Sequence, residues 1–160
     1  MRTFGLIGFP LEHSLSPAYF QQKFAEEGIV DAEYRLFPLE RISDFPRLIH
    51  SQKNWAGFNV TIPFKTTILP YLDELDESAA RIGAANVIKI VHTRQGTRLI
   101  GYNSDAMGFE RSLKEFLPEL AEGALILGTG GAAKAVKFVL DKNRVKAQFV
   151  SRSSQDNLLN

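Results

Sequence analysis

Gly-Phe-Asn-Val-Thr-Ile-Pro-Phe-Lys, residues 57 to 65, is the stretch on which the arrangement of the chain depends. Its apolar residues alternate with two polar ones, which predicts a strand, and Pro63 ends that strand because proline cannot donate to a neighbouring strand. Asn59 and Thr61 then share one face, with Lys65 just beyond the break. Such a strand end can hold a small polyhydroxylated molecule beside a proton-transferring group. Taken alone, the stretch fits an edge strand with a solvated face equally well.

A strand and a helix precede this stretch. Residues 3–9 predict a short buried strand, and the helix that follows has Ser16 as its N-cap, Pro17 in its first turn and Gly28 at its end. Ser14 and Ser16 then lie beyond the carboxyl end of the first strand and near a helix N-terminus, where hydroxyl and N–H groups favour an anion such as a carboxylate. Capping and turn formation are the commoner roles of such serines.

The rest of the first 117 residues continues the alternation of strands and helices, which predicts an α/β domain. A turn at Gln95-Gly96 returns the chain as a hairpin, so we expect a mixed, mainly parallel sheet. Ser104 or Asp105 would cap a helix that runs to about Phe116, and capping is the usual role of an acidic residue there. The remaining predictions are strands at 32–37, 55–62, 84–91 and 99–102 and helices at 39–51, 65–72 and 76–82.

Composition narrows the class of protein. The 160 residues hold 19 Lys and Arg against 18 Asp and Glu, so we expect neither nucleic acid nor a membrane surface as a partner. With no cysteine there is neither a disulfide nor a thiolate metal site, which suits a cytoplasmic protein. The isolated histidines, His13 and His50, have no partner at metal-ligand spacing, so we expect no metal.

Residues 128–133 read Gly-Thr-Gly-Gly-Ala-Ala, with a strand predicted before them at 124–127 and a helix after them at 134–142. This G-x-G-x-x-A pattern between strand and helix predicts a dinucleotide site, in which Gly128 permits the tight turn and Gly130 lets the backbone approach a pyrophosphate. The alternative is a tight turn that binds nothing. We therefore expect a first domain at 1–117, a linker at 118–123, and the first, incomplete part of a Rossmann-type NADP-binding domain at 124–160.

The next predicted strand, 146–150, ends at Ser151-Arg152-Ser153. A site for NAD has an aspartate or glutamate at this point, which hydrogen-bonds the ribose 2′-hydroxyl and repels a 2′-phosphate. A guanidinium grips such a phosphate with two hydrogen bonds, so Arg152 favours NADP. An exposed arginine at a strand end is the alternative.

Several motifs together resemble the shikimate dehydrogenase (shikimate/quinate dehydrogenase) family. They occur in the family's order and cover most of the chain: Ser14-Leu15-Ser16-Pro17, Asn59-Val60-Thr61-Ile62-Pro63-Phe64-Lys65, Gly83-Ala84-Ala85-Asn86, Gly101-Tyr102-Asn103-Ser104-Asp105 and Gly128-Thr129-Gly130-Gly131-Ala132-Ala133. The resemblance implies a cytoplasmic oxidoreductase, a monomer or homodimer, that reduces 3-dehydroshikimate to shikimate with NADP for aromatic amino acid biosynthesis. The reaction would run between a substrate domain and an NADP domain.

The same resemblance implies the roles of individual residues. Lys65 and Asp105 would be the catalytic pair, because reduction of a ketone by hydride leaves an alkoxide that must receive a proton. Substrate would be held at its carboxylate by Ser14 and Ser16 and at its hydroxyls by Asn59, Thr61, Asn86 and Asp105. The cofactor would be held by Gly128, Thr129, Gly130, Gly131, Ala132, Ser151, Arg152 and Ser153.

Two departures from the family pattern bear on these expectations. Ser151-Arg152-Ser153 stands where the family has Asn-Arg-Thr, and a further basic residue that often follows is absent. Only two strands of the nucleotide fold precede Asn160, so we expect further chain to complete it and to cover the apolar faces of these strands. A quinate-using relative and a binding module without catalysis are the alternatives.

Overall fold

The computed structural model describes residues 1–116 and 123–151. Its larger sheet has six strands in the order β2-β1-β3-β5-β6-β4. Strand β5 is antiparallel to its neighbours β3 and β6, whereas the pairs β1–β2, β1–β3 and β4–β6 are parallel. The predicted α/β fold with a mixed, mainly parallel sheet is confirmed. The strands are β1 (Arg2–Gly8), β2 (Ala32–Pro38), β3 (Trp55–Val60), β4 (Glu74–Leu75), β5 (Val87–Thr93) and β6 (Gly96–Tyr102).

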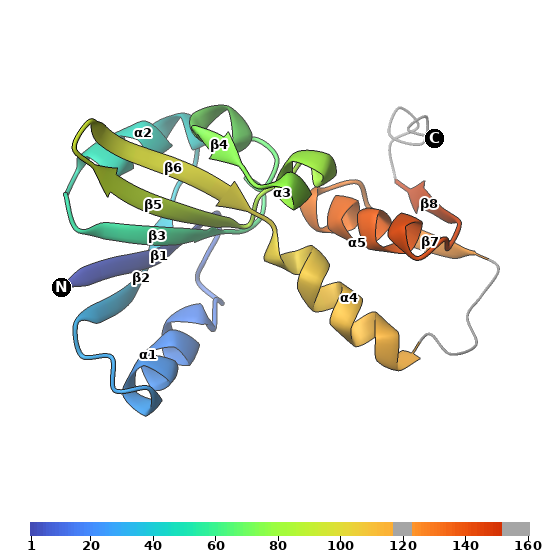
Figure 1. Cartoon of the computed structure of the whole chain (residues 1–160), viewed down its shortest axis with the longest axis horizontal. Coiled ribbons are helices and arrows are strands. Elements are labelled where there is room, and N and C mark those ends of the chain that lie inside the picture. The colour runs from blue at the N-terminus through green and yellow to red at the C-terminus, as the bar shows by residue number, and fades with distance from the viewer. Residues whose placement is uncertain (117–122, 152–160) are drawn as a thin grey trace.

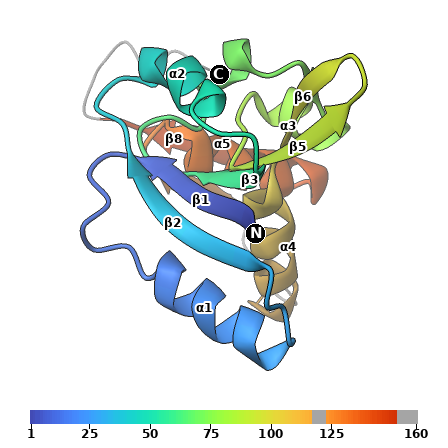
Figure 2. The same ribbon diagram turned by 90° about the vertical axis from the view of Figure 1, so that its left-hand side faces the viewer.

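Helices lie on both faces of this sheet, with α1 (Ser16–Glu26) below and α2 (Phe45–His50) above in Figures 1 and 2. The main core lies on the α2 side. There, apolar side chains of β3 and β5 pack against α2 and against the short 3₁₀ helix η2 (Leu69–Tyr71). Another 3₁₀ helix, η1 (Ile42–Asp44), leads into α2. This burial fixes which side chains of each strand are left for the opposite face.

Several predicted boundaries are wrong, and prolines account for most of the errors. The predicted helix at 39–51 begins only at Phe45, because Pro46 suits the first turn of a helix. The predicted helix at 65–72 is a turn followed by η2, because Pro70 has no N–H for an α-helical hydrogen bond. Strand β3 ends at Val60 rather than at residue 62.

A second unit follows the helix α4 (Ser104–Phe116), which we call the β7–α5–β8 unit. It consists of β7 (Ala124–Leu127), α5 (Gly131–Lys142) and β8 (Ala147–Val150), and β7 and β8 pair in parallel. Helix α5 packs against α4 and α3 (Glu77–Ile82), side by side in Figure 1, through small side chains that include Ala106 and Ala135. This packing brings the glycine turn close to the six-stranded sheet.

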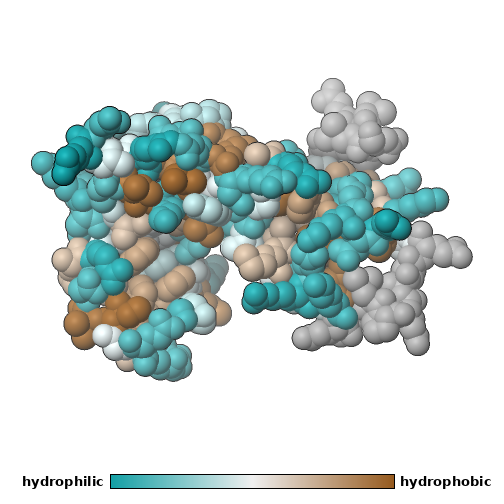
Figure 3. Space-filling model, in the orientation of Figure 1, coloured by the Kyte–Doolittle hydropathy of each residue, from teal (hydrophilic) through white to brown (hydrophobic). Residues whose placement is uncertain are grey.

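The surface differs between these two parts of the chain. On the face shown in Figure 3, hydrophilic side chains dominate over α4 and α5, while hydrophobic side chains gather over the sheet. The exposed apolar faces expected of the two-strand unit are present in β7, where Leu125 and Leu127 keep 69% and 82% of their surface exposed. No helix within residues 1–116 and 123–151 is long and apolar enough to cross a membrane.

Candidate active site

The predicted substrate-binding residues converge at one edge of the six-stranded sheet. The carboxyl ends of β1, β3 and β6 meet there, because these three strands run in the same direction. Strand β5 runs the other way, so its amino end, with Asn86 just before it, lies at the same edge. Segments distant in sequence thereby supply the neighbouring residues Lys65, Asn86 and Asp105.

Lys65 and Asp105 form an ion pair at this edge. Lys65 Nζ lies 2.7 Å from Asp105 Oδ2, and the two side chains keep 15% and 31% of their surface exposed. Partial burial strengthens such a pair relative to one in water, and it limits the positions that the ammonium can take. The Lys65 ammonium has three N–H donors, so it can keep this bond and still donate to a ligand. The structure brings together the two residues that the sequence pairs.

Asn86 supports the Asp105 carboxylate from the other side. Its amide is buried, and Nδ2 donates to Asp105 Oδ1 at 2.7 Å and to Ser104 Oγ at 2.9 Å. Its Oδ1 accepts from the Ser104 backbone N–H at 2.8 Å. Both polar atoms of the Asn86 side chain therefore form hydrogen bonds with the first turn of α4. Its expected contact with a substrate hydroxyl remains a prediction.

The N-cap of α4 is Asn103, and the predicted cap at Ser104 or Asp105 is wrong. Asn103 is buried, its Oδ1 accepts from the Ala106 N–H at 3.1 Å, and its Nδ2 donates to the Ala84 carbonyl at 2.9 Å. A helix has one N-cap, so the Asp105 side chain does not act as the cap. Both of its carboxylate oxygens face functional partners, Lys65 and Asn86.

Tyr34 is a residue of this site that the sequence reasoning missed. Its hydroxyl donates to Asn59 Oδ1 at 2.8 Å, so this bond uses the oxygen of the Asn59 amide and not its NH₂ group. Burial raises the pKa of Tyr34 to about 12, and a hydrogen bond with the Ser16 side chain opposes part of that rise. The ring also stacks on Phe20 of α1, with 4.2 Å between centroids. Nothing in the local pattern of β2 indicates this role, because it depends on β1 lying between β2 and β3.

The two predicted carboxylate-binding serines lie together after β1. The Ser16 backbone N–H donates to Ser14 Oγ at 3.3 Å, and both residues are half-buried. Ser16 is the first residue of α1 rather than its N-cap; Leu15 holds that position and makes no side-chain cap. Thr61 follows β3, and its N–H donates to the Ile7 carbonyl at 2.8 Å, which fixes it beside the end of β1.

The glycine turn has the backbone that a dinucleotide site requires. Gly128 has a φ of 106°, a value that L side chains rarely adopt, and the N-cap Gly130 is exposed with nothing within 4 Å of an added methyl group. The backbone just before α5 is therefore not covered by side chains, and the N-terminus of a helix favours phosphate. Gly131 begins that helix and lies against Lys65. Ser151 follows β8, whereas Arg152 and Ser153 lie outside the described residues.

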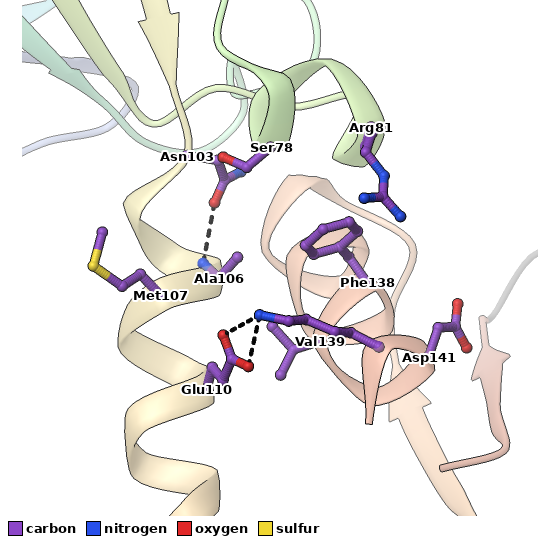
Figure 4. A pocket seen from close by; sticks show the side chains of 10 residues that line it. Ser78, Arg81, Asn103, Ala106, Met107, Glu110, Phe138, Val139 and Asp141 are labelled. Carbon is purple, nitrogen blue, oxygen red and sulfur yellow. Dashed lines mark hydrogen bonds and ion pairs between the residues drawn. The ribbon is translucent and has the colours of Figure 1, made fainter. Parts of the chain in front are cut away.

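A cavity of about 610 Å³ lies between α3, α4 and α5, and no pattern in the sequence predicts it. Figure 4 shows Arg81 beside the Phe138 ring, 5.1 Å from its centroid, and the ion pair of Glu110 with a lysine of α5. That lysine is Lys142, and its hydrogen bond lowers the pKa of Glu110. These contacts join α5 to the other two helices. Among the described residues, no group of three or more His, Cys, Asp or Glu side chains is placed to hold a metal ion.

Comparison with known proteins agrees with this geometry. Residues 6–88, more than half of the chain, match the family model described as the shikimate dehydrogenase substrate binding domain. The chain belongs to the shikimate dehydrogenase family. The matched residues include β1, β3 and the turn that carries Lys65.

Relatives and solved structures extend the likeness beyond that segment. Shikimate dehydrogenase (NADP(+)) of Geobacillus kaustophilus is 42% identical over 142 residues, covering 87% of this chain and 50% of that protein. The counterpart from Methanosphaera stadtmanae is 37% identical over 156 residues, covering 96% of this chain and 53% of that protein. Shikimate 5-dehydrogenase of Thermus thermophilus in complex with NADP(H) and shikimate superposes with a TM-score of 0.80 at 33% identity, covering 99% of this chain and 59% of that one. The chain spans about half the length of the curated relatives it matches.

Proposed function

We propose that this chain carries the substrate site, and the start of the nucleotide site, of an NADP-dependent shikimate dehydrogenase that reduces 3-dehydroshikimate to shikimate. Residues 1–117 would be the substrate domain, 118–123 a linker and 124–160 the first part of the NADP domain. The protein would work in the cytoplasm as a monomer or homodimer. The observation that carries the proposal is the Lys65–Asp105 pair, held by Asn86 at the sheet edge that the glycine turn approaches.

In the proposed reaction, Lys65 supplies the proton. The chemistry that NADPH would supply when bound is a hydride for the carbonyl carbon of 3-dehydroshikimate, which would leave negative charge on the carbonyl oxygen. The Lys65 ammonium donates a proton to this oxygen, which completes the hydroxyl of shikimate and leaves a neutral amine. In the reverse direction the amine takes the proton back. Asp105 keeps Nζ in place through their 2.7 Å contact.

The carboxylate and the hydroxyl groups of the substrate would be held by different side chains at the same edge of the sheet. Ser14 and Ser16 are hydroxyl donors for the carboxylate, near the N-terminus of α1. Asn59 presents its NH₂ group because Tyr34 occupies its oxygen, and Thr61 follows at the end of the same strand. Hydroxyl groups on the ring would bind these side chains together with Asn86 and Asp105. Donors at fixed separations favour a rigid ring that carries both a carboxylate and hydroxyls.

The nucleotide would bind at residues 128–132 and 151–153. The bare, exposed backbone at Gly130 lets a pyrophosphate approach the N-terminus of α5. Arg152, which lies outside the described residues, would bind the 2′-phosphate and select NADP over NAD. Its neighbours Ser151 and Ser153 would add hydroxyl donors.

Shikimate-dependent reduction of NADP⁺ by the full-length protein tests the proposal. We expect turnover in the wild type and a loss of at least ~100-fold in Lys65→Ala, because in this direction of the reaction that variant has no amine to take the proton from the shikimate hydroxyl. Asp141→Asn, on the exposed surface of α5, is the control and should keep wild-type rates. Normal turnover by Lys65→Ala would overturn the catalytic assignment. Competition between equal concentrations of shikimate and quinate separates the two substrates.

A further inference from the structure

Gly131 is a glycine that the dinucleotide motif does not require. In the pattern G-x-G-x-x-A the constrained positions are Gly128, Gly130 and Ala133, and residue 131 is one of the free positions. Gly131 also has no positive φ that would exclude a side chain. It is the first residue of α5, where neither the motif nor the backbone conformation excludes a side chain. Any constraint on residue 131 therefore comes from its surroundings.

That constraint is the stem of Lys65. A methyl group added at Gly131 would lie 2.6 Å from Lys65 Cβ and 3.4 Å from Lys65 Cδ. It would also lie 3.3 Å from the Cβ of Ala84, which is fully buried. Lys65 Cβ is the rigid end of its side chain, so the lysine cannot avoid the new methyl by changing a rotamer. Either the backbone at Lys65 or the start of α5 would have to move.

We propose that Gly131 is a positioning residue for Lys65, and this inference rests on the proposed function. Lys65 is then held at three points. Its carbonyl accepts from the Ala85 N–H at 2.8 Å, its stem lies against Gly131, and its Nζ contacts Asp105 at 2.7 Å. The glycine turn thereby fixes the proton donor from the nucleotide side. The first residue of α5 thus limits the position of the ammonium.

The test compares Gly131→Ala with Gly108→Ala in the full-length protein. Gly108 lies in α4, exposed, with nothing within 4 Å of an added methyl group, so it is a matched control. Shikimate binding is measured by calorimetry without nucleotide, so that a direct effect on NADP cannot contribute. We expect Gly131→Ala to weaken shikimate binding at least fivefold and to shift the pH dependence of turnover. Gly108→Ala should change neither.

Equal shikimate affinities and pH profiles in the two variants would overturn the inference, because α5 would then have moved away while Lys65 stayed in place. A double-mutant cycle with Lys65→Gly covers the case in which Gly131→Ala folds poorly. Removing Lys65 Cβ should relieve most of the loss in unfolding midpoint that Gly131→Ala causes. An equal loss in both backgrounds would show that the contact is absent. Failure of the proposed function has a different signature, which is no shikimate binding by the wild type, and the cycle then decides the Gly131 contact.

Discussion

The contact between Lys65 and Asp105 is an ion pair, so the charge of Asp105 matters as well as its shape. Asp105→Asn keeps the size of the side chain, but a neutral amide forms a weaker hydrogen bond with the lysine than a carboxylate does. We expect kcat/KM for shikimate to fall ~10²-fold or more, the range for loss of positioned acid–base catalysis. Initial rates of NADPH formation measure this. Asp141→Asn removes a carboxylate far from the site, and an equal loss there would contradict the assignment.

Tyr34 makes stability depend on pH in a defined window. Its pKa in the folded chain is about 12, against an ordinary 10.0, so above pH 10 the unfolded chain loses this proton while the folded chain keeps it. The contribution of the buried, protonated Tyr34 to the free energy of unfolding is therefore complete below pH 10, and it is lost as the pH rises toward 12. Urea unfolding of the wild type and Tyr34→Phe at several pH values measures this. We expect the wild-type advantage to shrink from pH 9.5 to 11.5, and a constant difference would rule out the shift.

At the scale of elements, the sequence predicted the strands well except for the two-residue β4 (Glu74–Leu75), which it missed, and it predicted the short helices poorly. Strands such as β1 and β7 are short apolar runs bounded by turn residues, and these local signals suffice. The predictions of helices at 39–51 and 65–72 were wrong because they rested on the spacing of apolar residues. That spacing does not show how Pro46 and Pro70 change the backbone hydrogen bonds. Asn103 was missed as the cap of α4 because its neighbours Ser104 and Asp105 have equal capping propensity. Only the tertiary bonds of Asn103 and Asn86 decide among the three.

The cap of α4 also holds the first turn of the helix, which carries Asp105. Asn103→Ala removes the acceptor for the Ala106 N–H and leaves the Ala84 carbonyl without its buried donor. We expect the free energy of unfolding to fall by about 2–4 kcal/mol, the sum of a lost cap and an unpaired buried carbonyl. Asn103→Ser keeps a cap oxygen and should lose less. Urea denaturation of the three proteins tests this order, and equal stability of the two variants would contradict the capping role.

For the whole molecule, the sequence indicated most residues of the candidate site but not how the β7–α5–β8 unit approaches it. The ordered motifs predicted that Lys65, Asp105 and the glycine turn act together. The direction of the strands explains why Lys65 and Asp105 lie at the same edge of the sheet. The contact of α5 with α3 and α4 depends on small residues such as Ala106 and Ala135, which have no distinctive pattern in sequence. The Gly131–Lys65 contact follows from that packing.

Widening this helix contact should therefore disturb the site from a distance. Ala135 is 1% exposed in the cluster between α5 and its neighbours, and Ala135→Leu adds a bulky side chain at this buried contact. We expect a loss of about 1–3 kcal/mol in stability from overpacking, with faster amide exchange across residues 123–151 than across 1–116. Ala25→Leu, at an exposed position of α1, is the matched control and should leave exchange unchanged. Because displaced α5 no longer holds the stem of Lys65, shikimate affinity should fall together with the protection of α5. Loss of protection with unchanged affinity would separate the nucleotide unit from the substrate site and contradict their coupling through Gly131.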